Sequence, residues 1–195
     1  MKLVILDRDG VINQDSDRYI KSPAEWQPIP GAIEAIARMH QGGFRIVVAT
    51  NQSGIGRGLF DMATFNAMND KMMEMVFRQG GRIDAVFFCP HTPEDACDCR
   101  KPLPGMALDI GRRYGVDLRE VPMVGDTLRD LQAAQAAGCE PHLVRSGRAA
   151  ALDAAQLASL VEQVPGTFVH SDLGELATHL LGRQQVRDSQ SGLLT

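Results

Sequence analysis

Residues 3–10, LVILDRDG, place four apolar residues directly before two carboxylates and a glycine. An apolar run of this length that ends at turn residues is typical of a strand buried on both faces of a parallel sheet. Asp7 and Asp9 are two positions apart, so on an extended backbone both side chains address the same side. Two carboxylates this close repel each other. We therefore expect a cation between them, and oxygen ligands of this kind suit Mg²⁺.

The rest of the chain alternates between strand and helix patterns. Strands are predicted at 3–6, 44–49, 85–88, 121–124, 141–144 and 167–169, and helices at 30–41, 61–79, 104–114, 127–137, 150–162 and 173–181. Strands separated by helices form parallel βαβ units. We expect an α/β fold with a doubly wound, mostly parallel sheet, as one domain over residues 1–182, followed by a polar tail at 183–195.

Composition is typical of an ordinary globular protein. The 195 residues carry a net charge of −4, which argues against a general nucleic-acid binder. No apolar run approaches the roughly 18 residues that a membrane helix needs, and the N-terminus does not resemble a signal peptide. We expect a cytoplasmic protein without nucleic-acid or membrane partners. The helical stripe of Met68, Met72, Met75, Val76 and Gln79 is interpreted as core filling, as is Cys139.

Further polar residues follow the other predicted strands. Thr50 ends the second strand region, Lys101 precedes the helix at 104, and Asp126 follows the fourth strand with Asp130 four residues beyond it. Ligands bind beyond the carboxyl ends of parallel strands, so these groups should converge on one crevice. Each residue alone could simply cap a turn or a helix. Together, carboxylates with a cation, a lysine and a hydroxyl suit an anion such as a phosphoryl group.

These motifs resemble the haloacid dehalogenase superfamily of phosphohydrolases, in the order Asp-x-Asp-Gly, Thr50, Lys101 and Gly-Asp with a further Asp. The resemblance covers residues 3–145 and implies a Rossmann-like core. It also implies that Asp7 attacks phosphorus and forms an aspartyl phosphate, while Asp9 protonates the leaving oxygen and later activates water. Thr50 and Lys101 would bind the phosphoryl oxygens.

The same resemblance assigns the metal ligands. Mg²⁺ would be held by the side chains of Asp7 and Asp126 and by the carbonyl of Asp9. Asp130 would orient Lys101 or bind a metal-bound water.

Residues 89–99, CPHTPEDACDC, form a second cluster. Cys89, His91, Cys97 and Cys99 are the donors of a closed tetrahedral zinc site, so we expect structural zinc without a catalytic role. The alternative is a set of reduced cysteines beside a loop histidine. The cluster runs directly into Lys101, so a bound ion would help to fix that residue.

The combination of DRDGVIN, TNQSGIGRG, CPH…CDCRKP and GDTLRDLQAA resembles the branch of D-glycero-D-manno-heptose 1,7-bisphosphate 7-phosphatases. Histidinol-phosphate phosphatases have similar motifs and remain the alternative, with other small phosphate esters. The branch removes the C7 phosphate during synthesis of nucleotide-activated heptose for lipopolysaccharide core or surface glycans. Its substrate contacts match Asn51, Gln52, Ser53, Arg100 and the segment 15–19, which includes Asp15 and Arg18.

Loop lengths agree with a small bisphosphate substrate. Neither the segment from Gly10 to Ile33 nor the region between the second and third strands is long enough for a cap domain of ordinary size. Short loops should therefore form the pocket, in a protein that we expect to be monomeric. Arg100 and Arg57 are spare cations that could hold a second phosphate, although Arg57 could equally be a solvated loop charge.

Two other classes of protein fit less well. A phospho-receiver domain would end its third strand with the acceptor aspartate, but Cys89 and Pro90 stand there. A zinc-based nucleic-acid module would need a basic surface with aromatic residues, which this acidic chain lacks. The glycines of GIGRG do not match a dinucleotide-binding fingerprint.

Overall fold

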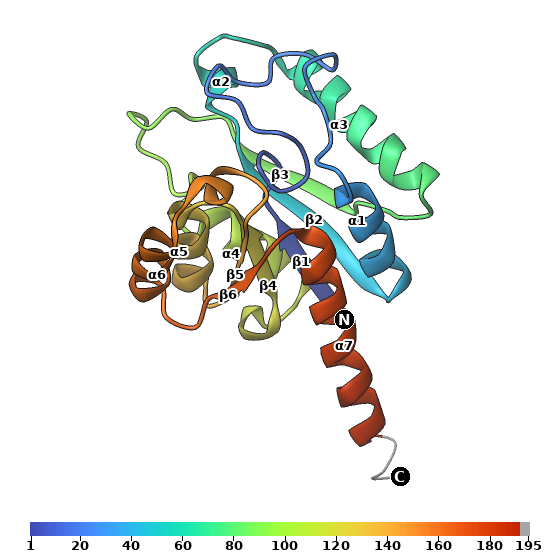
Figure 1. Ribbon diagram of the computed structural model, residues 1–195. Coiled ribbons are helices and arrows are strands. Elements are labelled where there is room, and N and C mark those ends of the chain that lie inside the picture. Colours follow the sequence, from blue (N-terminus) through green and yellow to red (C-terminus); the bar gives the residue numbers. More distant parts are fainter. Residues whose placement is uncertain (192–195) are drawn as a thin grey trace.

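Six parallel strands form one sheet in the order β3-β2-β1-β4-β5-β6 (Figure 1). The computed structural model describes residues 1–191. The strands are β1 (Lys2–Leu6), β2 (Phe44–Asn51), β3 (Ala85–Cys89), β4 (Pro122–Gly125), β5 (Glu140–Val144) and β6 (Phe168–His170). The strand order reverses between β1 and β4, which is the topological switch point of a doubly wound sheet. The predicted fold class is confirmed.

The apolar run that opens the chain is the central strand. Val4 and Leu6 pack into the core on one face of the sheet, while Leu3 and Ile5 pack into the core on the other. All four side chains are at most 2% exposed, which explains a sequence without polar alternation. Burial on both faces therefore fixes the position at which Asp7 leaves the strand.

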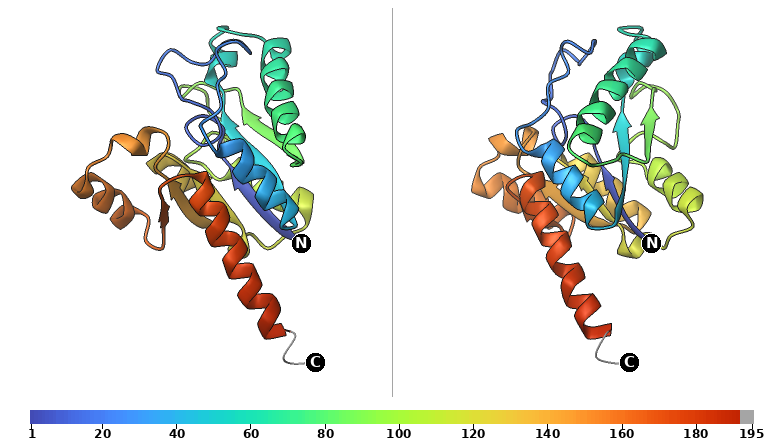
Figure 2. Two further views of the ribbon diagram at one scale, coloured as in Figure 1. Left: turned by 45° about the vertical axis from the view of Figure 1, so that its right-hand side comes forward. Right: turned by 90° about the vertical axis from the view of Figure 1, so that its right-hand side faces the viewer.

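Helices cover both faces of the sheet (Figure 2). One layer contains α1 (Ala32–Gln41), α3 (Met62–Arg78) and α7 (Leu173–Ser191), and the other contains α4 (Gly105–Tyr114), α5 (Leu128–Ala137) and α6 (Ala154–Gln163). A one-turn helix α2 (Ser53–Gly56) follows β2, and 3₁₀ turns lie at η1 (Leu118–Glu120) and η2 (Arg148–Ala151).

The interpretation of the methionine stripe as core is confirmed for its central members. Met68, Met72 and Val76 are fully buried, and Met75 is half-buried against the same core. Gln79 lies at the exposed C-terminal end of α3. Cys139 is buried in the core on the other face, as expected.

Two helix boundaries differ from the prediction by more than two residues. The region predicted as one helix at 150–162 is split, because Asp153 accepts from the backbone N–H of Gln156 at 2.8 Å and starts α6 there. The last helix does not end near residue 181 but continues to Ser191, so the predicted tail is helical as far as that residue. Residues 192–195 of the predicted tail lie outside the described residues. Arg183, which forms an ion pair with Glu140 at 2.8 Å, helps to hold the extension.

No second fold covers the carboxyl edge of the sheet within residues 1–191. The segment between β1 and α1 contains only isolated bridges of Asn13 to Asp9 and Pro28, and it is anchored by the fully buried Trp26. Only α2 and α3 lie between β2 and β3. Short loops therefore border the crevice, as predicted. In the same residues, no helix is long and apolar enough to cross a membrane.

Candidate active site

A polar crevice of about 210 Å³ opens at the carboxyl ends of β1, β2 and β4, beside the switch point. Its lining contains five of the six residues predicted to converge there, namely Asp7, Asp9, Thr50, Lys101 and Asp126. The sixth, Asp130, is not in the lining and contacts Lys101 instead. The remaining lining residues are Asp15, Ser16, Asp17, Tyr19, Ile20, Asn51, Gln52, Ser53, Arg100, Arg129 and Arg148.

Lys101 is the buried cation of the crevice. Its Nζ lies 3.0 Å from Asp7 Oδ1 and 2.7 Å from Asp130 Oδ1, and it donates to the carbonyl of Ala49 at 2.9 Å. Burial alone would lower the pKa of Lys101, but Asp130 and Asp7 outweigh it and raise that pKa. Asn51 fixes the backbone of Lys101 through two hydrogen bonds of 3.0 and 3.1 Å. The ammonium is therefore charged and held in place.

Asp130 reaches Lys101 from the first turn of α5. Asp130 and Thr127 form a capping box, in which the backbone N–H of Thr127 donates to Asp130 Oδ2 at 3.1 Å and the Thr127 hydroxyl donates to the same oxygen. Gly125 allows this approach, because a Cβ at that position would lie 2.1 Å from Asp130 Cβ. The cap at the helix start thus leaves the other carboxylate oxygen facing Lys101.

Three carboxylates gather around one point beside Lys101. One oxygen each from Asp7, Asp126 and Asp130 lies within 4.8 Å of the others. Burial, partly offset by Lys101, raises the pKa of Asp7 to about 8, and burial raises the pKa of Asp126 to about 6. One ammonium does not neutralise three buried carboxylates. Since Asp130 is held by Lys101 and Thr127, the oxygens of Asp7 and Asp126 are the carboxylate ligands that fit a divalent cation such as Mg²⁺.

Two glycines shape the position of Asp126. A Cβ on Gly10 would lie 2.2 Å from Asp126 Oδ2, and one on Gly147 would lie 2.1 Å from the same oxygen. That oxygen accepts from the backbone N–H of Arg148 at 2.7 Å. A side chain at either glycine would displace the carboxylate, so the backbone itself forms the cradle.

Asp9 lies in the same crevice but in a different environment. Its carboxylate accepts from Gln52 Nε2 at 2.7 Å, from Asn13 Nδ2 at 2.8 Å and from the Arg8 guanidinium at 3.1 Å. Gln52 Nε2 also donates to Thr50 Oγ1 at 2.9 Å. The Asp9 side chain is thus not part of the three-carboxylate group, and its orientation is tied to that of Thr50.

Arg8 and Asn13 are functional neighbours that the sequence analysis did not identify. Arg8 is 1% exposed and lies over the ring of Phe65 at 5.6 Å from its centre. Both residues stand within the motif DRDGVIN, and their closeness to Asp9 in the sequence could have indicated that they contact it.

The predicted zinc ligands come together at the end of β3. Cys89 Sγ lies 3.1 Å from Cys99 Sγ, 3.8 Å from Cys97 Sγ and 3.5 Å from His91 Nδ1. Ligands of a tetrahedral zinc ion, with bonds of about 2.3 Å to sulfur, stand about 3.8 Å apart. Arg100 donates to the carbonyl of His91 at 3.3 Å. The cluster therefore fits a closed zinc site and connects directly to the crevice.

Not every predicted substrate-binding residue reaches the crevice. Arg18 is exposed and is not among the lining residues. Arg57 also lies outside the lining and stands 3.7 Å from Glu94 in the loop of the cysteine cluster. Of the two predicted spare cations, only Arg100 borders the crevice.

Two other arginines that the sequence analysis missed do border it. Arg129 follows Asp126 in the first turn of α5, and Arg148 lies in the turn after β5. Residues that follow the carboxyl end of a parallel strand gather at the ligand-binding edge of the sheet. Applied to the fifth predicted strand, this rule indicates the region of Arg148, although it does not indicate its contacts.

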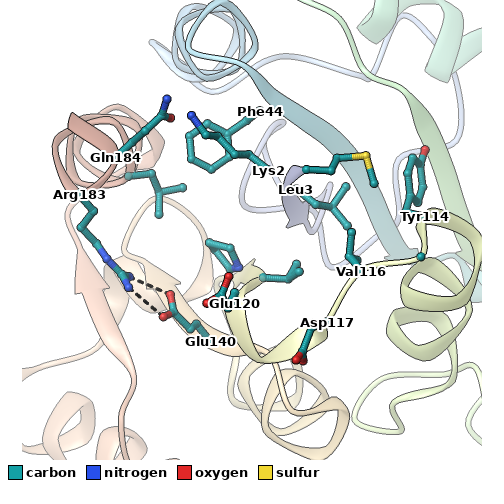
Figure 3. Close-up of a pocket in the computed structure, with 15 residues that line it drawn as sticks. Lys2, Leu3, Phe44, Tyr114, Val116, Asp117, Glu120, Glu140, Arg183 and Gln184 are labelled. Atoms are coloured by element: carbon teal, nitrogen blue, oxygen red, sulfur yellow. Dashed lines mark hydrogen bonds and ion pairs between the residues drawn. The ribbon is translucent and has the colours of Figure 1, made fainter. Parts of the chain in front are cut away.

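A separate hollow of about 390 Å³ lies at the opposite, amino end of the sheet (Figure 3). It is bordered by Leu3, Phe44 and Tyr114, with the Arg183–Glu140 ion pair at its edge. None of the candidate catalytic residues borders this hollow, so its larger volume does not make it the reaction site.

A buried Asp7–Lys101 pair beside grouped carboxylates, at the switch point of this sheet, is the arrangement that the resemblance to haloacid dehalogenase phosphohydrolases predicts. The family model Hydrolase_like, described as HAD-hyrolase-like, matches residues 98–176. A D-glycero-beta-D-manno-heptose-1,7-bisphosphate 7-phosphatase of Bordetella bronchiseptica is 57% identical over 93% of this chain and 98% of its own. The chain therefore belongs to the family of D-glycero-beta-D-manno-heptose-1,7-bisphosphate 7-phosphatases, and it is a phosphoric monoester hydrolase.

Further relatives agree with this assignment. The enzyme of the same name from Pseudomonas aeruginosa is 51% identical over 92% of this chain and 97% of its own. The crystal structure of D,D-heptose 1.7-bisphosphate phosphatase from B. bronchiseptica, complexed with magnesium and phosphate, is 56% identical in sequence. It superposes with a TM-score of 0.88 and covers 94% of this chain and 99% of its own.

Proposed function

We propose that this protein removes the C7 phosphate of D-glycero-beta-D-manno-heptose 1,7-bisphosphate through an aspartyl-phosphate intermediate. The observation that carries the proposal is the buried contact of 3.0 Å between Asp7 Oδ1 and Lys101 Nζ, in a chain 57% identical to a phosphatase of that name. The proposed reaction is a step in the synthesis of nucleotide-activated heptose for lipopolysaccharide core or surface glycans.

Asp7 is the proposed nucleophile. Its Oδ1 accepts from the backbone N–H of Arg8 at 2.7 Å and contacts Lys101, so its direction is fixed before substrate arrives. The carboxylate attacks phosphorus, the bond from phosphorus to the C7 oxygen breaks, and its electron pair leaves with that oxygen. Lys101 and the hydroxyl of Thr50 donate to the non-bridging phosphoryl oxygens, over which the charge of the transition state is spread.

Asp9 moves the proton in both steps. It protonates the departing C7 oxygen and then takes a proton from the water that attacks the aspartyl phosphate. Phosphate is released and the Asp7 carboxylate is restored. The hydrogen bonds of Asp9 to Asn13 and Gln52 keep its carboxyl group at the edge of the crevice, apart from the carboxylates grouped at Lys101.

The proposed magnesium ligands are Asp7, Asp126 and the carbonyl of Asp9. Bound there, Mg²⁺ neutralises charge shared by the nucleophile and the phosphoryl group. Asp130 stays on Lys101 and holds the ammonium in reach of phosphate.

We propose that Cys89, His91, Cys97 and Cys99 bind structural zinc. Four protein ligands leave no open position for water, so this ion has no part in the reaction. It fixes the loop whose His91 carbonyl accepts from Arg100. Zinc-bound thiolates suit a reducing compartment, so we place the protein in the cytoplasm.

The sugar and its C1 phosphate are proposed to contact the residues that border the mouth of the crevice. These are Asp15, Asn51, Gln52, Ser53 and Arg100. Arg18 and Arg57 are left out because neither borders the crevice. Since one chain supplies the whole lining, we propose that a monomer is active.

Phosphate release from competing substrates tests the proposal. The kcat/KM for the β-anomer of the heptose bisphosphate should exceed that for the α-anomer, histidinol phosphate and fructose 1,6-bisphosphate by ~100-fold, or about 2.7 kcal/mol of transition-state discrimination. Turnover of histidinol phosphate at a comparable kcat/KM would contradict the substrate but not the chemistry.

A further inference from the structure

Arg148 connects two distant parts of the chain at the mouth of the crevice. Its side chain extends from η2, after β5, to the loop that follows β1. Nε donates to Asp15 Oδ2 at 2.6 Å, and a terminal nitrogen donates to Asp17 Oδ1 at 2.9 Å. All three residues border the crevice.

The backbone of the same turn is fixed against the catalytic carboxylates. The Arg148 N–H donates to Asp126 Oδ2 at 2.7 Å, and the hydroxyl of Ser146 donates to the carbonyl of Gly10 at 3.0 Å. Gly147 leaves no free space, since a Cβ there would lie 2.6 Å from the Gly10 carbonyl oxygen. The Arg148 side chain therefore starts from a rigid point and sets the position of the loop that it contacts.

The charges of Asp15, Asp17 and Arg148 affect how easily an anionic substrate enters the crevice. Asp15 and Asp17 place two carboxylates beside a crevice that must admit an anion with a second phosphate. Arg148 is the cation that contacts both of them. Without Arg148, both carboxylates would face the incoming substrate without the cation that contacts them.

The contacts contribute little to folding stability. The Arg148 side chain is 49% exposed and that of Asp17 is 89% exposed, so water screens their ion pair. Asp15 is less exposed, at 24%, and is the firmer of the two contacts. Their effect should therefore appear in substrate binding more than in unfolding.

We propose that Arg148 is a positioning and specificity residue that holds the loop of Asp15 and Asp17 and cancels its charge, so that a bisphosphate can enter. The inference rests on the proposed function, because it needs a substrate with a second phosphate. It predicts a larger role for Arg148 with a bisphosphate than with a phosphate monoester that has no other charge.

Steady-state kinetics of Arg148→Met on two substrates test this. The KM for the heptose bisphosphate should rise about tenfold with little change in kcat, while kcat/KM for p-nitrophenyl phosphate should fall less than threefold. Arg148→Lys should recover part of the loss, because it restores the charge without the forked contact. Arg145→Met is the matched control, since Arg145 donates to the Leu152 carbonyl and does not border the crevice.

Two further readouts separate charge from structure. Adding Asp17→Asn to Arg148→Met should restore part of the affinity by removing one repelling carboxylate. At 1 M salt, where charges are screened beyond about 3 Å, the KM of Arg148→Met should approach that of the wild type. Equal losses on both substrates, unchanged by salt, would overturn the proposal and leave Arg148 with a structural role at Asp126.

The test also separates this inference from the proposed substrate. If the wild-type protein fails to hydrolyse the heptose bisphosphate, the proposed substrate is wrong, and the ratio of KM values is then measured with fructose 1,6-bisphosphate against fructose 6-phosphate. A rise confined to the bisphosphate supports the role of Arg148, and an equal rise on both contradicts it.

Discussion

Lys101 Nζ and Asp130 Oδ1 stand 2.7 Å apart, with side chains only 2% and 1% exposed. A buried ion pair of this kind adds little net stability, because desolvation of both charges offsets their attraction. In this protein the ion pair instead fixes the position of the Lys101 ammonium. Asp130 is fixed by the first turn of α5, and through it the ammonium is fixed beside Asp7.

Replacing Lys101 by Met should therefore damage both activity and folding. The kcat should fall by ~10²–10³-fold, because a donor to the phosphoryl oxygens is lost. The free energy of unfolding in denaturant should fall by about 3 kcal/mol, because Asp7 and Asp130 are left buried without a cation. Lys101→Arg should recover stability more than kcat. A Met variant that keeps kcat within tenfold would contradict the role of Lys101.

Gly147→Ala tests the cradle of Asp126. The added Cβ would lie 2.1 Å from Asp126 Oδ2, so the carboxylate must move. The Mg²⁺ concentration needed for half-maximal activity should rise ~10–100-fold. Gly182→Ala is the matched control, since nothing lies within 4 Å of a Cβ there. If the two variants respond alike to Mg²⁺, Asp126 is not a metal ligand.

Removing one predicted zinc ligand should release the ion. Wild-type protein should contain one zinc per chain by elemental analysis, and Cys97→Ser should contain almost none. Its Tm and its kcat/KM should both fall, because Arg100 loses its anchored partner in the loop. Cys139→Ala should retain the zinc, since Cys139 lies in the core and outside the cluster. Zinc-free wild-type protein of full stability would rule out a structural ion.

A histidine cluster should make stability depend on pH. His142 Nδ1 lies 3.0 Å from His170 Nε2, with His179 of α7 against both rings and Glu140 3.6 Å from His142 Nε2. Burial, with the neighbouring His170, lowers the pKa of His142 from 6.5 to about 3. Below pH 6.5 the unfolded chain therefore binds a proton that the folded protein does not, so stability is lost as pH falls.

From pH 7 to 5 this histidine should remove about 2 kcal/mol from the free energy of unfolding. Chemical denaturation of wild type and His142→Asn across that range isolates the effect, because the variant lacks the titrating ring. Parallel curves for wild type and His142→Asn would show that titration of His142 does not cause the loss of stability at low pH.

Much of the site could be predicted, because the ends of the buried strands can be recognised in the sequence. Asp7, Thr50 and Asp126 each end or follow an apolar strand, and parallel strands bring such residues to one edge. Arg57 shows where this reasoning stops. It lies in a glycine-rich loop whose path no local pattern fixes, and it contacts Glu94 rather than the crevice.

The sequence analysis did not identify Arg148, because the residues that it contacts are far from it in the sequence. Its side chain contacts Asp15 across more than a hundred residues of sequence, and only the folded chain brings the two together. Helix ends depend on similar contacts. The split before α6 follows from the cap at Asp153, and the Arg183–Glu140 ion pair anchors the start of the α7 extension.

The central claim is that Asp7 becomes phosphorylated, and Asp9→Asn with p-nitrophenyl phosphate tests it most directly. Nitrophenolate leaves without a proton, so the first step should proceed while hydrolysis of the intermediate is slow. Rapid mixing should show a burst of about one nitrophenolate per chain, and borohydride reduction after acid quench should convert residue 7 to homoserine, seen by mass spectrometry. Continued turnover without a burst, or a phosphoryl group on any other residue, would contradict the account.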